Sequence, residues 1–267
     1  MKTLQNVLAQ QLSSPSIDGH IHVCSQRGAL PKGAFKGLPP IRIGFADIEY
    51  NHLAPFSNMA DIYKEAVKLP NTYLLATGPN MKGVKAAYDF LQANGGCYGF
   101  GELKLYDEYL GEPIKYKKIS FAREVCSFSE KAGDLPVYIH YELNNDSEVM
   151  KLENLLEEYP SVPIVLCHCG LNDHNQSYAW NQCVRLCRTY ENLWVDVTWY
   201  AAQWLCNNPL LLLQLPGDRV FWGSDVSPRW EQCEHKTITI DQIKQYRDIL
   251  TPYIRSDQNI IRLFNMF

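Results

Sequence analysis

The sequence predicts an α/β fold, a single-domain (β/α)8 TIM barrel with an irregular first βα unit. Two observations predict it: eight short apolar segments of strand character follow one another along 267 residues, and helical patterns separate most of them. Short apolar strands that helices cover on both faces are typical of a parallel sheet. Eight such repeats favour a closed barrel, which takes about 250 residues, over an open doubly wound sheet.

The first predicted strand is IDGHIHV, residues 17–23, and a loop rich in Gly, Pro and cations follows it over residues 24–40. This loop shows no helical period, so we expect it to replace the first helix and to form a flap over the barrel mouth. The other predicted strands are richer in apolar residues. They begin at Ile41, Thr72, Cys97, Leu135, Pro163, Asn192 and Val220.

Helical patterns fill the intervals between these strands. The clearest is DSEVMKLENLLEEY from Asp146, whose apolar side chains recur at helical spacing. Ser57 is a favourable first residue for the helix that it begins, and Gly95 and Gly96 end the helix from Met81. The other helices are predicted over 121–131 and 175–190, from about Ala201, and over 241–253 and 256–267.

Composition indicates a globular protein with a substantial core, because 46% of its residues are hydrophobic and 20% are charged. Neither a linker nor a repeat divides the chain, so we predict one domain over residues 1–267, with 1–16 as an N-terminal extension. The net charge of -4 and the lack of a basic run argue against nucleic acid as a partner. The longest apolar block, residues 210–215, is far shorter than the ~20 residues of a membrane span. The expected partner is a small molecule.

The nine cysteines are expected to be reduced and mostly buried. A chain of this length folds without disulfides, contains no C-x-x-C pair, and begins without the unbroken apolar run of a secretory signal. We therefore expect a cytoplasmic location. Cys167 and Cys169 flank His168, and strand alternation predicts that both point to the face opposite that histidine, which argues against them as zinc ligands.

His20 and His22 are the first candidate metal ligands. In a strand, Asp18, His20 and His22 share one face, while the odd-numbered residues of 17–23 share the other. Two imidazoles on one face suit a metal ion, although two ordinary hydrogen-bonded histidines give the same pattern.

Ionisable side chains also recur at the ends of the later strands. Burying such groups unpaired costs several kcal/mol, so apolar strands contain them where they are paired or bind a metal. The carboxyl ends of barrel strands meet at one face, where the active site forms. The later candidates are Glu102 and Lys104 in strand four, His140 in strand five, His168 in strand six and Asp225 in strand eight.

The combination of HxH, GELK, YIHYE, LCHCG and WGSDV resembles the metal-dependent amidohydrolase superfamily, which includes the TatD-like hydrolases. The likeness extends from Ile17 to the closing NIIRLFNMF. It implies an enzyme that uses metal-activated water on a small-molecule amide, ester, lactone or phosphoester, with a homodimer as a further expectation. It also implies the ligands of the first metal ion, which are His20, His22, His140 and Asp225.

The number of ions stays open at this point. In two-metal members, a glutamate or a carboxylated lysine of strand four bridges the ions, and the histidine of strand six binds the second. Glu102 follows Gly101, as in TatD-type members, which favours Glu102 over Lys104 as the bridge. In a one-metal site of the decarboxylase type, His168 would contact substrate instead. Zn²⁺ fits mixed imidazole and carboxylate ligands best, and Mn²⁺, Fe²⁺ and Ni²⁺ also accept them.

Asp225 and His168 are the expected catalytic residues. A metal ion lowers the pKa of bound water from 15.7 to about 7, and the resemblance implies that Asp225 takes the proton and returns it to the leaving group. Lys104 and Arg229 are candidate cations for an anionic substrate group, although Lys104 would equally form an ion pair with Glu102. The alternative functions are a decarboxylase or hydratase of a small carboxylic acid, a TatD-like nuclease, and a barrel that binds ligand without turnover.

Two further carboxylates lie on the predicted strands. Asp18 is a candidate to orient a metal-binding histidine through its second ring nitrogen, or else a residue of the strand start. Asp196, in NLWVDVTW, is expected to accept hydrogen bonds from neighbouring backbone amides rather than to contact substrate. The aromatic residues Tyr141, Trp199 and Trp230 are expected to pack rather than to line the site.

Overall fold

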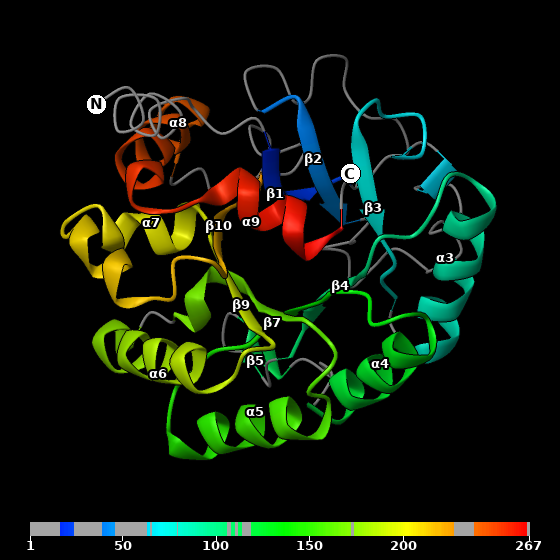
Figure 1. Cartoon of the computed structure of the whole chain (residues 1–267), viewed down its shortest axis with the longest axis horizontal. Coiled ribbons are helices and arrows are strands. Elements are labelled where there is room, and N and C mark those ends of the chain that lie inside the picture. Colours follow the sequence, from blue (N-terminus) through cyan, green and yellow to red (C-terminus); the bar gives the residue numbers. More distant parts are fainter. Residues whose placement is uncertain are drawn as a thin grey trace, which may run out of the picture.

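Eight parallel strands form the centre of the molecule (Figure 1). The structure is a computed structural model that describes residues 17–23, 39–45, 63–64, 66–78, 80–105, 108–109, 112–113, 119–171, 174–226 and 238–265. The strands make two sheets, in the orders β1-β2-β3 and β10-β9-β8-β7-β4. Their bounds are β1 Ile17–His22, β2 Ile41–Phe45, β3 Thr72–Leu75, β4 Phe100–Lys104, β7 Val137–His140, β8 Ile164–Leu166, β9 Leu193–Val197 and β10 Val220–Trp222.

Backbone hydrogen bonds join these two sheets into one ring. At one seam, the amide of His22 donates to the carbonyl of Val226, just after β10, over 2.9 Å. At the other, the amide of Ala76, just after β3, donates to the carbonyl of Gly99 over 2.9 Å. All eight strands correspond to segments that the sequence predicts. The predicted (β/α)8 barrel is therefore confirmed.

Helices surround the ring on its outer side, and the last helix of the chain lies across one end of it (Figure 1). Seven helices predicted from the sequence are present, with α7 beginning two residues early and α8 continuing as a short 3-10 helix, Thr251–Tyr253. The helix predicted from Ser57 and the predicted flap over 24–40 lie mostly outside the described residues. The helix bounds are α3 Met81–Ala93, α4 Ile119–Lys131, α5 Asp146–Glu158, α6 Gln176–Thr189, α7 Trp199–Leu205, α8 Ile240–Leu250 and α9 Ser256–Leu263.

Asparagine side chains begin three of these helices. Asn80, Asn145 and Asn175 each accept a hydrogen bond from the backbone amide three residues later, at 3.0 to 3.1 Å. Such contacts satisfy amides that the first turn of a helix leaves without a partner. They fix where α3, α5 and α6 start, and thereby the length of the loops that follow β3, β7 and β8.

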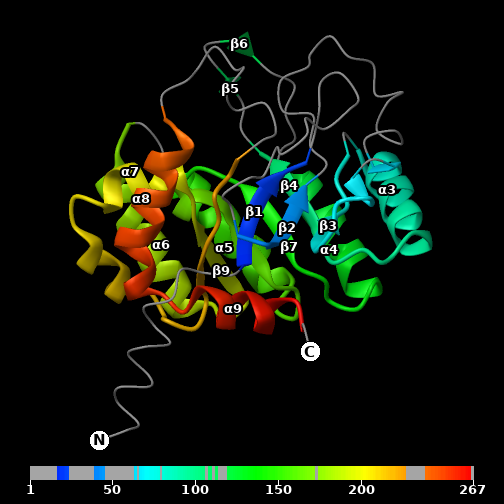
Figure 2. The same cartoon turned by 90° about the horizontal axis from the view of Figure 1, so that it is seen from above.

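The helix α9 covers the amino-terminal end of the barrel. The side-chain amide of Asn259 donates to the carbonyls of Val220, at 2.6 Å, and Gly217, at 3.1 Å. Asp257 accepts a hydrogen bond from the amide of Ile17 at 3.2 Å. Figure 2 shows α9 across one end of the barrel and the short strands β5 (Glu108–Tyr109) and β6 (Glu112–Pro113) beyond the other. The carboxyl ends of the strands therefore open away from α9.

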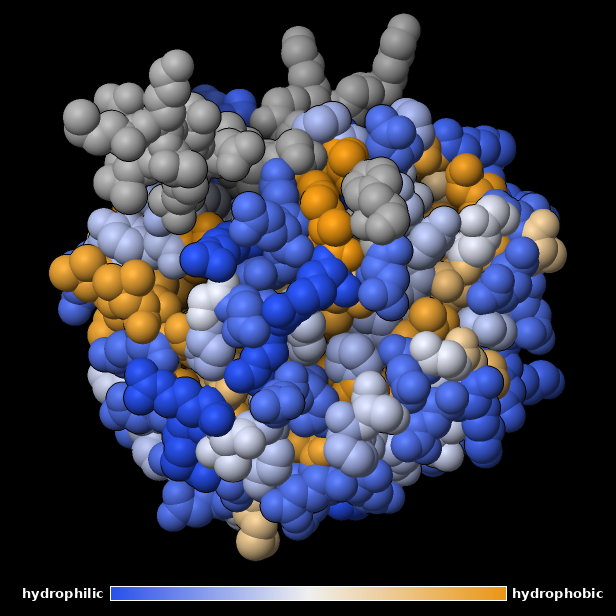
Figure 3. Space-filling view, in the orientation of Figure 1, coloured by the Kyte–Doolittle hydropathy of each residue, from blue (hydrophilic) through white to orange (hydrophobic). Residues whose placement is uncertain are grey.

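The visible surface is mainly polar, with a hydrophobic area at the left edge of Figure 3, where α7 lies in Figure 1. Leu210 and Leu213, on the 3-10 helix Pro209–Gln214 that follows α7, are 59% and 63% exposed. Of the helices in the described ranges, none combines the length and the apolar character that crossing a bilayer requires.

The strand β1 departs from the regular alternation that the sequence predicts. Its pairing with β2 is irregular between Asp18 and Ile21, as in a β-bulge. Ile17 therefore lies in the apolar cluster inside the barrel, while Ile21 lies in the outer layer under the helices. The ring of His20 is also inside, with its centroid 4.7 Å from that of Phe45. The expectation that Ile17 faces away from His20 is wrong, because the bulge shifts the alternation by one residue.

Gly223, directly after β10, lies where the chain packs closely against β1. A substitution at Gly223 therefore tests this packing. A Cβ atom on Gly223 would lie 2.3 Å from the Cβ atom of His20. We expect Gly223→Ala to lower the free energy of unfolding in urea by about 1–3 kcal/mol, because β1 must shift to relieve the overlap. Gly217→Ala is the matched control, since a Cβ atom there meets nothing within 4 Å. Equal stability of the two variants would contradict the packing described.

Candidate metal centre

Six predicted ionisable side chains meet at the carboxyl ends of the strands. They project from β1, β4 and β7 and from the residues that follow β8 and β10. Their ligand atoms form two groups of three, and within each group all atoms lie within 4.8 Å of one another. The first cluster is His20, His22 and Asp225, and the second cluster is Glu102, His140 and His168.

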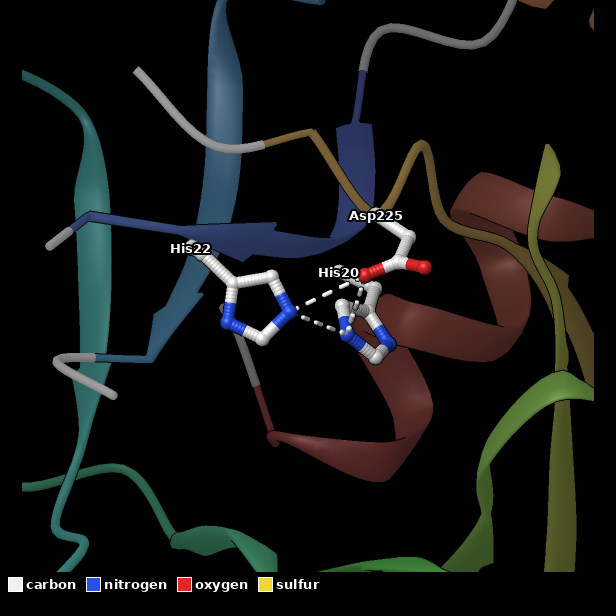
Figure 4. Close-up of side chains that lie close together, drawn as sticks. All are labelled: His20, His22 and Asp225. Atoms are coloured by element: carbon white, nitrogen blue, oxygen red, sulfur yellow. Dashed lines mark hydrogen bonds and ion pairs between the residues drawn. The ribbon is translucent and has the colours of Figure 1, made fainter. Parts of the chain in front are cut away.

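In the first cluster, two imidazoles point at one carboxylate (Figure 4). The Nε2 atoms of His20 and His22 lie 3.4 Å apart. The Oδ1 atom of Asp225 is 2.9 Å from Nε2 of His22 and 3.4 Å from Nε2 of His20. The same nitrogen of each ring therefore faces the space that the three side chains share.

In the second cluster, two imidazoles meet one oxygen of Glu102. The Oε1 atom of Glu102 lies 2.9 Å from Nδ1 of His140 and 3.2 Å from Nε2 of His168. The two ring nitrogens are 3.1 Å apart. The resemblance implies His140 as a ligand of the first ion, whereas this geometry groups it with Glu102 and His168.

Glu102 also faces the first cluster, through its other oxygen. Its Oε2 atom is 3.6 Å from Nε2 of His22 and 4.0 Å from Nε2 of His20. The Nζ atom of Lys104 lies 3.8 Å from the same oxygen, so the ion pair anticipated from the sequence is present. Glu102 therefore stands between the clusters with Lys104 beside it. Arg229, the other candidate cation, lies outside the described residues.

Backbone conformation directs two of these side chains. His168 and Asp225 both have φ of 56°, in the left-handed region that costs non-glycine residues about 1–3 kcal/mol. His168 comes after β8 has ended at Leu166, so strand alternation no longer sets the direction of its ring. Left-handed residues at the ends of two strands are typical of functional sites, where the surrounding structure holds strained conformations in place.

Cys167 does not lie where the sequence predicts. The side chains of Val165, in β8, and Cys167, just after it, both belong to the cluster inside the barrel. The Sγ atom of Cys167 lies within 4.8 Å of ligand atoms of His20 and Asp196. The expectation that Cys167 points to the opposite face from His168 is wrong, because the left-handed turn at His168 brings its ring back to the side of Cys167.

Asp196 and Thr198, at the end of β9, contact the metal-ligand candidates from behind. The Oδ2 atom of Asp196 lies 2.6 Å from Nδ1 of His20, and its Oδ1 atom accepts a hydrogen bond from the amide of His168 at 2.6 Å. The hydroxyl of Thr198 is 2.7 Å from Nδ1 of His168. The amide contact confirms the prediction for Asp196. The contact to His20 and the role of Thr198 were not predicted, although the D-x-T spacing places both residues on one face of a strand.

Asp18 holds backbone rather than a histidine ring. Its Oδ1 atom accepts hydrogen bonds from the amides of Ser224, at 2.7 Å, and His20, at 3.3 Å. Its Oδ2 atom is buried and finds no hydrogen-bond partner in the described part of the chain. Burial raises the pKa of Asp18 to about 6. The ring contact that the sequence suggests for Asp18 is made by Asp196.

The charges of the two clusters depend on one another. Burial would raise the pKa of Glu102, but Lys104 and His140 outweigh it and hold the pKa well below its usual range. Burial opposes ionisation of Asp225 too, yet the imidazoles around it lower its pKa to about 2. Burial would lower the pKa of His168, but its hydrogen bond to Glu102 and the charge of Asp225 raise it to about 9. Ionised carboxylates are thus buried where positive charge must balance them.

This donor set fits divalent cations. Imidazole nitrogen and carboxylate oxygen are the usual ligands of zinc when cysteine is not used. The facing Nε2 atoms of His20 and His22 are buried, and without a proton both would direct lone pairs at the same space. A cation accepts both lone pairs and also balances the carboxylate charge. Each cluster offers three such donors.

Comparison with known proteins agrees with this fit. A family model for amidohydrolases matches residues 111–251, just over half of the 267 residues. No curated protein matches the chain.

Solved structures resemble this fold over nearly the whole chain. A dihydroorotase from Campylobacter jejuni is 15% identical, with 94% of this chain and 83% of that one covered and a TM-score of 0.57. An amidohydrolase from Burkholderia multivorans is 10% identical, with 93% and 98% covered and a TM-score of 0.60. A TIM-barrel protein from Bordetella bronchiseptica is 14% identical, with 99% and 90% covered and a TM-score of 0.52. Because the family model matches more than half of the chain, the protein belongs to the amidohydrolase family of metal-dependent hydrolytic enzymes.

Proposed function

We propose that the protein is a hydrolase with two divalent metal ions, which acts on a small-molecule amide, ester, lactone or phosphoester. The position of Glu102 is the observation on which this depends. Its Oε1 atom faces the imidazoles of the second cluster, and its Oε2 atom faces those of the first. A carboxylate placed in this way can ligate one ion with each oxygen. Zn²⁺ is the proposed metal, because both clusters combine imidazole with carboxylate.

The second cluster supports two ions rather than one. In a one-ion site His140 would join the first cluster, and His168 would be available to substrate. Instead, Nδ1 of His140 and Nε2 of His168 lie 3.1 Å apart, and both lie against one oxygen of Glu102. A decarboxylase or hydratase with a single ion is therefore less well supported than a two-ion hydrolase.

The metal ions and Asp225 have different roles in the proposed reaction. When bound, the ions act as Lewis acids that acidify water and polarise the carbonyl or phosphoryl oxygen of the substrate. We assign the general base to Asp225, whose low pKa keeps it ionised at neutral pH. Its side chain is 13% exposed, against 0% and 1% for His20 and His22, so it is the member of the first cluster that reaches the substrate side. Having taken the proton of water, Asp225 would return it to the leaving group.

A cation beside the clusters supports an anionic substrate. The Nζ atom of Lys104 lies 3.8 Å from Glu102, and its side chain is 9% exposed. We propose that Lys104 binds a carboxylate or phosphate group of the substrate, with Arg229 as a second cation. His168 is proposed to contribute to catalysis as a ligand of the second ion rather than by contact with substrate.

The cellular location and the partner are proposed from the cysteines and from the net charge. The seven cysteines of the described residues are free thiols, which supports a cytoplasmic location. The net charge of -4 supports a small-molecule substrate rather than a nucleic acid.

Metal analysis tests the proposal directly. Elemental analysis of the purified protein should give two equivalents of divalent metal per chain. Dialysis against a chelator should abolish hydrolysis of a panel of esters, lactones, amides and phosphoesters, and added Zn²⁺ should restore it. One equivalent would support the one-ion alternative, and a chain that binds no metal would contradict both.

Asp225→Asn should lower kcat by about 10²–10⁴-fold, because the amide cannot accept a proton as the carboxylate does. Circular dichroism and thermal melting should show that the variant still folds. Asp241→Asn makes the same chemical change at a surface ion pair with Lys244 and should retain full activity. Full activity of Asp225→Asn would refute the assigned base.

Lys104→Met should raise KM for anionic substrates by about 10–100-fold, which corresponds to the ~1.5–3 kcal/mol of a hydrogen bond to a charged group. Neutral esters should be affected much less. Steady-state kinetics on matched anionic and neutral substrates measure the difference. Lys244→Met, at the surface of α8, is the control. Equal effects on both substrate types would argue against Lys104 as the anion-binding residue.

A further inference from the structure

We propose that Asp196 is a positioning residue that couples the two metal clusters, because one buried carboxylate orients a ligand of each. This inference rests on the proposed function, since it requires His20 and His168 to bind metal. It concerns residues behind the ligands, whose role neither the family match nor the structural likenesses assign.

The position of Asp196 makes this coupling geometrically direct. It lies on β9, which pairs with β8 on one side and β10 on the other, the strands that lead to His168 and Asp225. Its side chain is fully buried. One carboxylate oxygen meets the ring of His20 and the other meets the backbone of His168, each at 2.6 Å. A displacement of Asp196 would therefore move one ligand in each cluster, His20 in the first and His168 in the second.

At His20, Asp196 selects the tautomer of the ring. An ionised carboxylate only accepts hydrogen bonds, so Nδ1 of His20 must carry the proton that lies toward Oδ2. The other nitrogen, Nε2, is then left with its lone pair. This is the atom that faces His22 and Asp225 in the first cluster. Carboxylates commonly hold metal-binding histidines in the correct tautomer in this way.

At His168, Asp196 holds the backbone while Thr198 holds the ring. The amide of His168 donates to Oδ1 of Asp196, which anchors the residue in its left-handed conformation. The hydroxyl of Thr198 lies 2.7 Å from Nδ1, and Nε2 is thereby directed to Glu102, 3.2 Å away. The ring of His168 thus has a support of its own, whereas the ring of His20 is held by Asp196.

The buried charge of Asp196 is balanced by donors around it. The ring of His20 and the backbone amide of His168 supply two of these donors. The Sγ atom of Cys167 also lies close, within 4.8 Å of a carboxylate oxygen of Asp196. Both oxygens of Asp196 thus have hydrogen-bond partners, and through them Asp196 acts on His20 and His168.

Asp196→Asn separates the two contacts because an amide has only one acceptor oxygen. The backbone N–H of His168 cannot change, so the oxygen of Asn is expected to stay on it. The amide NH₂ then faces Nδ1 of His20, which must accept and must carry its own proton on Nε2. That proton blocks the nitrogen that faces the first cluster. Thr198→Val removes only the ring support of His168 and should weaken the second cluster instead.

Metal titration provides the first test. Metal-free protein is titrated with Co²⁺, followed by visible absorption, and each affinity is measured by competition with a chelator. Wild-type protein should bind two equivalents. Asp196→Asn and Thr198→Val should each lower the affinity of one site by about 10–100-fold, the usual effect of removing such a partner. Asp241→Asn should match the wild type. If Asp196→Asn binds both ions with unchanged affinity, the inference is overturned.

The tautomer of His20 provides a test that does not depend on activity, and its decisive measurement is made on the wild-type protein. Nitrogen-15 spectra of metal-free protein labelled at histidine distinguish a proton on Nδ1 from one on Nε2, and loss of a signal in His20→Gln assigns the ring. Wild-type His20 should be protonated on Nδ1, and Asp196→Asn should move the proton to Nε2. A wild-type proton on Nε2 would overturn the inference. Failure of wild-type protein to bind any metal would instead overturn the proposed function, and this inference with it.

Discussion

Glu102 places a buried negative charge between two pairs of imidazoles, and the rest of the site is arranged to accommodate it. An ionised carboxylate in a dry interior costs several kcal/mol unless positive charge and hydrogen-bond donors surround it. Lys104 and His140 are close enough to lower its pKa despite its burial. Metal ions at the two clusters would place further positive charge beside both of its oxygens. The same requirement explains why imidazoles, rather than apolar side chains, occupy the ends of β1, β7 and β8.

Regular strands alone would not assemble this arrangement. Successive side chains of a strand alternate between faces, so inward-pointing ligands from many strands reach a common space only at certain registers. The structure adjusts the direction of three of them through backbone irregularities. A bulge in β1 turns His20 inward, and left-handed residues turn His168 and Asp225 toward the centre. Asp18 and Asp196 stabilise these irregular segments by accepting hydrogen bonds from the amides of Ser224 and His168.

The same irregularities mark the limit of what the sequence predicts. Strand and helix positions follow from apolar spacing, and the ligand candidates follow from ionisable residues in apolar strands, so both could be predicted. The neighbours of those ligands could not be predicted. A bulge or a left-handed residue moves a side chain to the other face of the strand, and the composition gives no clear signal of either. The faces that the sequence predicts for Ile17 and Cys167 are wrong for this reason. The carboxylate that contacts the ring of His20 is Asp196 rather than Asp18. Asp196 is far from His20 in the sequence, so strand alternation around His20 does not predict this contact.

The exposed fractions of the side chains at the site indicate the side from which substrate enters. The side chains of His20, His22 and Glu102 are at most 1% exposed, so they face no solvent. His140 is 24% exposed, Asp225 13% and Lys104 9%, and these side chains lie on the open side. The proposed base and the proposed anion-binding cation are therefore both where an incoming substrate would meet them. The buried ligands behind them are shielded from water that would compete for the metal, and Asp196 holds the ring of His20 from the side that substrate cannot reach.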